Sequence, residues 1–324
     1  MRTWPRVYVA AFALAILCAP HAEAQQTKVP RIGYLRFIEF AGYDDAFRHG
    51  LRELGYVDGQ NIRVEYRYAG GSIERLAELA TELVNLKVDV IVAASSQSVE
   101  AARGATKTIP IVFPVAFDPV ESGFVVSLAR PGGNLTGLSP LNPTVTTKRV
   151  ELLREAIPRV SHVAVLRNPT NAGSSFALRE TAAAAKRMGL RLQALEARSP
   201  DEVEAAFRAA VKEHAGALMV ISDNLFFTQQ KRIIDLGNRH RLPGMFDTRD
   251  FVQSGGLMSY GADLNDLFRR AAAYVDKILK GASPANLPVE QATKFELFIN
   301  LKSAKDMRLI IPRPVLLRAD HIIE

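Results

Sequence analysis

The stretch VDVIVAASSQS, residues 88–98, carries the pattern that sets the fold. Its nearly unbroken apolar run is typical of a strand buried on both faces of a parallel sheet. The run ends in the polar residues Ser95, Ser96 and Gln97, and a helical pattern follows. Because ligands of open parallel sheets bind beyond the carboxyl ends of the strands, this corner is the first candidate for a binding site.

Outward from this stretch, short apolar strands alternate with amphipathic helices along the chain. The segment Ile73–Leu86 before it carries leucines at helical spacing, and Ala217–Ile221 is a second continuous apolar strand. Turn residues interrupt the pattern at Arg130–Asn134, after which it starts again. The alternation predicts right-handed βαβ units, and therefore parallel sheets with helices on both faces.

The two halves of the chain repeat one order of features. The pattern D-x-V-x-S-G occurs at Asp118–Gly123 and again at Asp250–Gly255, each time shortly after an apolar residue followed by proline. Upstream of each copy an apolar strand ends in a polar corner, and the second such corner is Ser222–Asn224. We interpret the chain as two similar α/β lobes whose strand ends face one cleft.

That cleft defines the candidate ligand-binding residues. They come from the polar ends of the expected strands: Tyr34, Ser95, Ser96, Gln97, Asp118, Asn168, Asp223, Asn224 and Asp250. The helix start at Ser95 suits a carboxylate or phosphate, although serine there is equally an ordinary N-cap. Asp118 and Asp250 suit a ligand ammonium or a structural cap.

The remaining candidates differ in how strongly the sequence favours ligand binding over a structural role. Asp223 and Asn224 make the stronger case, because polar side chains at the end of a buried strand serve no core. Asn168 lies in a sequence that is also an ideal turn. Tyr34, together with Phe37 and Phe40, stacks on an aromatic ligand or forms part of the core, and the sequence leaves both open.

The first residues have the features of a secretory signal peptide. Arg2 and Arg6 precede the apolar run Val7–Cys18, and Ala22–Ala24 is a small-x-small cleavage site. We expect residues 1–24 to be removed and the mature protein to work in the periplasm, with a retained membrane anchor as the alternative. Cys18 is the single cysteine of the sequence and lies within this segment, so the mature chain has no thiol chemistry.

Composition and motifs exclude several classes of function. The 324 residues carry a formal net charge of +7, but the basic side chains are scattered among acids along expected helices, which argues against nucleic acid. Phosphate-binding loops, nucleophile elbows and zinc-binding histidine pairs are absent from the sequence. We therefore expect no cofactor, no metal and no catalysis, with an exported α/β enzyme acting on a small carboxylate as the alternative.

Three blocks of sequence resemble one protein family. They are DGQNI at 58–62, SLARPGGNLTG at 127–137 and KFELFINLK at 294–302, and the resemblance runs from about Pro30 to the C-terminus. The chain is similar to the ABC-transporter substrate-binding proteins that include tryptophan and tyrosine binders. The resemblance implies a type I periplasmic-binding fold, with two Rossmann-like lobes that have parallel sheets and are joined by a hinge.

The resemblance also implies a function and a division of the chain. We expect residues 29–138 and about 257–290 to form one lobe, and residues 139–256 and about 291–324 to form the other. The crossings would lie near Leu138, Gly255–Leu257 and Val289–Thr293. The ligand would be an amino acid or a related small carboxylate, aromatic or not, held at Ser95, Ser96, Asp118 and the Asp223–Asn224 corner. The partners would be ABC permease subunits in the inner membrane, served by a monomer.

Overall fold

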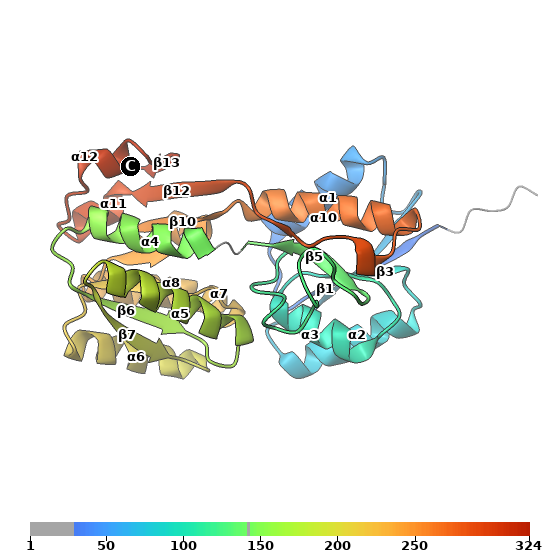
Figure 1. Ribbon diagram of the computed structural model, residues 1–324, viewed down its shortest axis with the longest axis horizontal. Coiled ribbons are helices and arrows are strands. Elements are labelled where there is room, and N and C mark those ends of the chain that lie inside the picture. Colours follow the sequence, from blue (N-terminus) through green and yellow to red (C-terminus); the bar gives the residue numbers. More distant parts are fainter. Residues whose placement is uncertain (1–28, 141–142) are drawn as a thin grey trace, which may run out of the picture.

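A computed structural model describes residues 29–140 and 143–324, and it has two α/β lobes side by side (Figure 1). Lobe 1 has a six-stranded sheet in the spatial order β11-β5-β4-β3-β1-β2. Its strands are β1 (Arg31–Arg36), β2 (Arg63–Tyr68), β3 (Val90–Ala93), β4 (Ile111–Phe113), β5 (Leu135–Ser139) and β11 (Glu290–Gln291). All of its strand pairs are parallel.

Helices cover both faces of the lobe 1 sheet. Helices α1 (Ala41–Glu53) and α10 (Leu264–Leu279) pack on one face, and α2 (Ile73–Asn85) and α3 (Ser96–Ala105) pack on the other. Helix α2 forms as its leucine spacing predicts, with Leu76, Leu79 and Leu83 buried. The short 3₁₀ turn η1 (Pro284–Asn286) follows α10.

Lobe 2 has a seven-stranded sheet in the order β13-β12-β10-β9-β8-β6-β7. Its strands are β6 (His162–Arg167), β7 (Arg191–Glu196), β8 (Ala217–Val220), β9 (Gly244–Phe246), β10 (Met258–Ala262), β12 (Phe295–Asn300) and β13 (His321–Ile323). The pair β10–β12 is antiparallel, and the other pairs are parallel. The fold is thus the expected pair of α/β lobes with mostly parallel sheets.

The helices of lobe 2 also form two layers. Those that contribute to one buried cluster are α4 (Pro143–Ala156), α5 (Ala172–Arg187), α11 (Leu301–Asp306) and α12 (Arg313–Leu316). Those that contribute to the other are α6 (Pro200–Lys212), α7 (Asn224–Thr228), α8 (Gln230–Arg239) and α9 (Arg249–Gln253). Each sheet is therefore buried on both faces.

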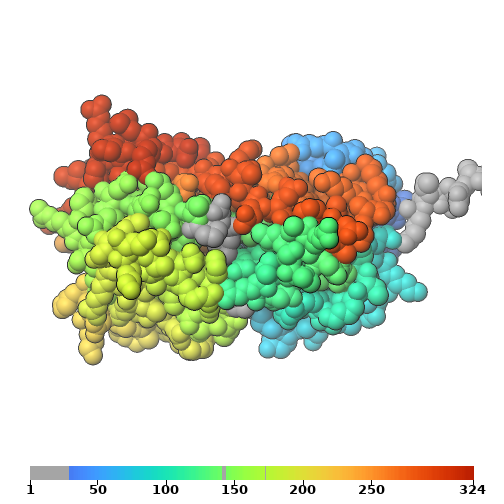
Figure 2. Space-filling view, viewed as in Figure 1, coloured from blue at the N-terminus to red at the C-terminus, as the bar shows by residue number. Residues whose placement is uncertain are grey.

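The chain passes between the lobes three times. It leaves lobe 1 between β5 and α4, returns between β10 and α10, and leaves again between β11 and β12. Figure 2 shows the later segments, in orange and red, running across from one lobe to the other. The second crossing lies at Asp263, after the expected position of Gly255–Leu257, because β10 pairs with β9 and β12 and so belongs to the lobe 2 sheet.

The predicted signal peptide, residues 1–24, lies outside the described residues. Within the part that the structure describes, no helix combines the length and the apolar character needed to cross a membrane.

Close packing of α1 on α10 gives a test of the lobe 1 core. A Cβ atom added at Gly50 of α1 would lie 2.2 Å from the backbone oxygen of Arg269 on α10. We expect Gly50→Ala to lower the free energy of unfolding by about 1–3 kcal/mol, because overpacking forces the two helices apart. Gly42, on the same helix, has no heavy atom within 4 Å of such a Cβ, so Gly42→Ala is the matched control. Equal unfolding midpoints in urea for the two variants would contradict this packing.

Candidate functional site

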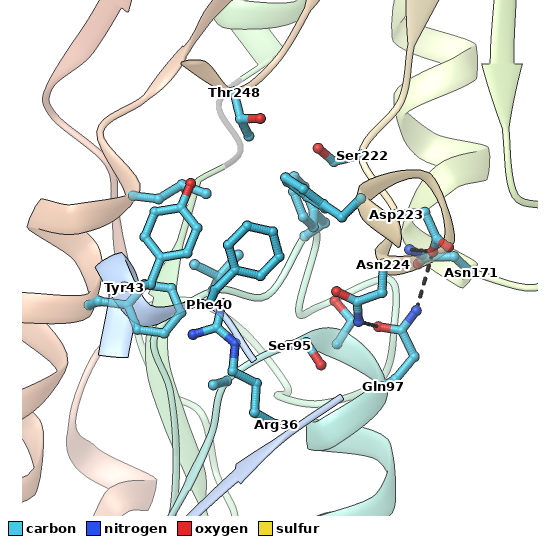
Figure 3. A pocket seen from close by; sticks show the side chains of 17 residues that line it. Arg36, Phe40, Tyr43, Ser95, Gln97, Asn171, Ser222, Asp223, Asn224 and Thr248 are labelled. Atoms are coloured by element: carbon cyan, nitrogen blue, oxygen red, sulfur yellow. Dashed lines mark hydrogen bonds between the residues drawn. The ribbon is translucent and has the colours of Figure 1, made fainter. Parts of the chain in front are cut away.

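The carboxyl ends of the central strands bring polar and aromatic side chains together between the lobes. They surround a cavity with about 550 Å³ of empty space, solvent at its mouth included. Figure 3 shows the side chains that line it. They are Arg36, Phe40, Tyr43, Ala94, Ser95, Ser96, Gln97, Val115 and Phe117 from the first part of the chain, and Asn171, Ser222, Asp223, Asn224, Phe227, Thr248, Leu264 and Phe268 from the second.

Five of the nine residues named from the sequence line this cavity. They are Ser95, Ser96, Gln97, Asp223 and Asn224. They come from the ends of β3 and β8, the two continuous apolar strands that run into polar corners. That these side chains contact a ligand stays a prediction.

The structure places the other four outside the lining. Tyr34 is fully buried on the α1 side of the sheet and donates a hydrogen bond of 2.7 Å to Asp44, because its side chain lies on the inner face of a central strand. Asp118 stands in a turn with φ of 37° and accepts from the backbone N–H of Glu121 at 3.0 Å. The segment that follows Asp118 forms turns and not a helix.

Asn168 and Asp250 lie directly behind the lining. The Asn168 amide donates to Asp223 at 2.9 Å, and Asp250 accepts a short hydrogen bond from the hydroxyl of Tyr43. Both thus contact residues of the cavity wall, one within lobe 2 and one across the cleft.

Asp223 is a buried carboxylate held by neutral donors. It accepts from Asn168 and Asn171 at 2.9 Å each, from Gln97 at 3.2 Å, and from the backbone N–H of Leu225 at 2.9 Å. It is 4% exposed, and no lysine, arginine or histidine lies within ion-pair distance of it among the described residues. A buried charge without a counter-ion favours a positively charged partner in the cavity.

Arg36 is the other charged side chain of the lining, and lobe 1 already neutralises it. Its guanidinium pairs with the buried Asp44 at 2.5 Å. It also lies over the rings of Phe40, Tyr43 and Phe268, at 5.3, 5.5 and 5.0 Å from their centroids. Asp223 therefore leaves the cavity with one uncompensated negative charge.

Aromatic rings form much of the remaining wall, and the sequence pattern predicted few of them. Tyr43 stacks on Phe268 with centroids 5.2 Å apart, although α1 and α10 are far apart in the chain. Phe40, which the sequence did suggest as a stacking residue, meets Phe227 of lobe 2 edge-on at 5.3 Å. Phe37 is buried in the core instead. Phe40, Tyr43, Phe227 and Phe268 together form an aromatic slot, which suits a flat ring.

Several contacts cross the cleft and hold the two lobes together. The amide of Gln97 donates to Asp223 and accepts from Asn224 at 2.7 Å, while Tyr43 donates to Asp250. Burial, together with the charge of Asp250, raises the pKa of the Tyr43 phenol well above its ordinary value, so this hydroxyl stays protonated as a donor. At the outer edge, Arg179 pairs with Glu121 at 2.6 Å.

Over residues 29–140 and 143–324 there is no cluster of three histidine, cysteine, aspartate or glutamate side chains that could hold a metal ion. The charged and polar groups of the cavity are arranged as hydrogen-bond partners around an empty space, which is an arrangement for holding a small molecule.

Two α/β lobes, three crossings and a polar-aromatic cavity between the lobes define the class of type I periplasmic-binding proteins. A family model for ABC transporter substrate binding proteins matches residues 32–323, and the chain belongs to that family. It is an ABC transporter substrate-binding protein.

Individual relatives agree with this assignment. A tyrosine-binding protein from Clostridioides difficile (strain R20291) is 29% identical over 281 residues, which cover 86% of this chain and 81% of that protein. A conserved domain protein from Vibrio cholerae has a crystal structure that matches with a TM-score of 0.86 at 30% identity, covering 91% of this chain and all of that one. An ABC domain from Streptococcus pneumoniae in complex with L-Trp also matches with a TM-score of 0.86, at 27% identity over 91% of this chain and 99% of the other.

The chain matches the L-Trp complex with a higher TM-score than it matches a structure described as open. The ligand-free, open structure of a substrate binding protein with adhesive properties from Clostridium difficile has a TM-score of 0.68 at 25% identity, with 91% of this chain and 99% of that one covered.

The cross-cleft bonds predict how the ligand-free protein behaves. We expect the double variant Gln97→Ala, Tyr43→Phe to shift the lobes toward an open arrangement, because it removes the cross-lobe hydrogen bonds of both side chains. Small-angle scattering should then give a larger radius of gyration than for the unmodified protein. The control is Tyr56→Phe, which removes a bond to Asp276 within lobe 1 and should leave the radius unchanged. A double variant as compact as the control would contradict a role of these bonds in closure.

Proposed function

We propose that this substrate-binding protein captures an amino acid with an aromatic side chain in the interlobe cavity. The observation that carries the proposal is Asp223, a buried carboxylate without a cation at the wall of an aromatic-lined cavity. A ligand ammonium would complete its charge in a partly dry site, where charge-assisted hydrogen bonds are strong.

A partner for the ligand carboxylate is available next to Asp223. Helix α3 begins at Ser96. The N-cap Ser95 accepts from the amide of Ser98, which leaves the amides of Ser96 and Gln97 without an acceptor inside the helix. The positive end of its dipole adds to their attraction for an anion. Gln97 of that first turn bonds Asp223 directly, so both ends of a zwitterion would have partners within one corner of the cavity.

The side chain of the ligand would then occupy the aromatic slot. Phe40, Tyr43, Phe227 and Phe268 offer ring faces and edges there. The similarity to a tyrosine-binding protein and to a protein crystallised with L-Trp supports an aromatic amino acid for this chain as well.

We further propose that the protein works as a monomer in the periplasm, delivers its ligand to ABC permease subunits of the inner membrane, and has no catalytic activity of its own. The alternative is an exported enzyme acting on a small carboxylate. Mass spectrometry of the ligand carried through purification separates the two. An intact amino acid supports a binding protein, and turnover of an added aromatic amino acid would support the enzyme.

The charge of Asp223 gives the sharpest test of the ligand's ammonium. We expect Asp223→Asn to weaken amino acid binding by about 2–5 kcal/mol, because the ammonium would lose its charged partner inside a desolvated site. Isothermal titration calorimetry with tyrosine, phenylalanine and tryptophan measures this. The control Asp118→Asn alters a carboxylate outside the cavity and should keep the affinity while changing the melting temperature slightly. Equal affinities for the two variants would show that Asp223 only caps helix α7.

Export makes a separate prediction. The basic start, the apolar run and the Ala22–Ala24 site should direct cleavage after Ala24. N-terminal sequencing of the protein recovered from the periplasmic fraction should then begin at Gln25. A protein that retains Met1, or that carries lipid on Cys18, would contradict cleavage at this position.

A further inference from the structure

Thr248 has a buried hydroxyl that the protein itself does not use. The residue is 5% exposed and lines the cavity, and its Oγ1 atom has no hydrogen-bond partner among the described residues. Leaving a buried hydroxyl without a partner costs stability, so such groups are uncommon in folded proteins.

A comparison with equivalent positions shows that this is unusual within the same cavity. Ser95, Asn171, Asp223 and Thr248 all stand at the N-cap of a helix that begins at the cleft. The first three accept a hydrogen bond from a backbone N–H of their own helix, at 3.2, 3.2 and 2.9 Å. Thr248 makes no such bond. Its hydroxyl therefore does not serve as the cap that threonine usually provides here.

Thr248 lies apart from the corner proposed for the charged groups of the ligand. It follows β9, whereas the amides that hold Asp223 from within lobe 2 follow β6, on the opposite side of β8 in the sheet. Figure 3 shows Thr248 separated from the cluster of Asp223, Asn171 and Gln97. A ligand whose ammonium meets Asp223 would reach Thr248 with a more distant part of the molecule.

The surroundings of Thr248 suit a neutral polar group on a ring. Tyr43, Leu264 and Thr248 line both the main cavity and a smaller, more polar hollow beyond it, where Asp247, Arg249 and Glu296 contribute. At Thr248 the aromatic part of the cavity wall thus borders a polar space. A ligand ring without a polar substituent would have no use for such a space. A single neutral hydroxyl can satisfy a hydrogen-bonding substituent of the ligand, whereas it would leave a buried charge without a counter-ion.

We propose that Thr248 is a specificity-determining residue whose hydroxyl bonds a polar group on the ligand ring. The preferred ligands are then aromatic amino acids with such a group, a phenol hydroxyl above all, and phenylalanine binds more weakly. This inference rests on the proposed function, since it takes the ligand to be an aromatic amino acid. The inference names Thr248 as the residue that distinguishes one aromatic amino acid from another.

The test compares tyrosine with phenylalanine on Thr248→Val, which replaces the hydroxyl with a methyl group of similar size. Calorimetry should show that the unmodified protein prefers tyrosine and that the variant binds tyrosine about three- to tenfold more weakly, the usual range for one hydrogen bond. Its affinity for phenylalanine should stay within about twofold of that of the unmodified protein. Thr248→Ser retains a hydroxyl and should keep most of the preference for tyrosine.

Each other outcome overturns the inference in a recognisable way. Equal losses for tyrosine and phenylalanine in Thr248→Val would place the hydroxyl at the common amino acid part of the ligand. If Thr248→Val binds both amino acids as tightly as the unmodified protein, the hydroxyl has no role in ligand binding. If the unmodified protein binds tyrosine and phenylalanine equally well, there is no specificity for Thr248 to determine. Binding of neither amino acid to the unmodified protein would refute the proposed ligand class and this inference together, which the other outcomes would not do.

Discussion

Parallel strands all end at the same edge of their sheet, and the cavity of this protein depends on that constraint. Right-handed connections return the chain to the opposite edge each time, so residues far apart in sequence arrive at one surface. In lobe 1 this brings Arg36 and Ser95 to the wall of one cavity, and in lobe 2 it brings Asp223 and Thr248 to separate parts of that wall. With the two edges facing each other, the cleft collects polar loops without interrupting either core, because each sheet is already buried on both faces.

The sequence could predict those parts of the site that follow from a single strand. Ser95–Gln97 and Asp223–Asn224 stand where continuous apolar runs stop, and a polar side chain at that point has no place in a core. Tyr34 shows the limit of this reasoning. A strand buried on both faces is apolar along its whole length. Its pattern therefore does not distinguish residues that lie under a helix, as Tyr34 does, from residues at the strand end that reach the cleft.

Other features depend on tertiary contacts that local patterns do not encode. Tyr43 and Phe268 reach the cavity only because α1 and α10 pack against each other, and nothing in either helix signals that contact. The predicted crossing at Gly255–Leu257 would place strand β10 in lobe 1. The apolar pattern of β10 fits either lobe, and only its antiparallel pairing with β12 shows that it belongs to lobe 2. No local pattern marks Thr248, because the sequence repeat singles out Asp250, two residues later, which accepts a hydrogen bond from Tyr43.

The three crossings have a consequence for the energetics of binding. Two domains on one flexible linker lose much orientational freedom when they close on a ligand, and that loss weakens the complex. Here three separate segments tie the lobes together, so most relative orientations are forbidden before any ligand arrives. Closure therefore costs little conformational entropy, and a small cavity with few contacts can still be an adequate binding site.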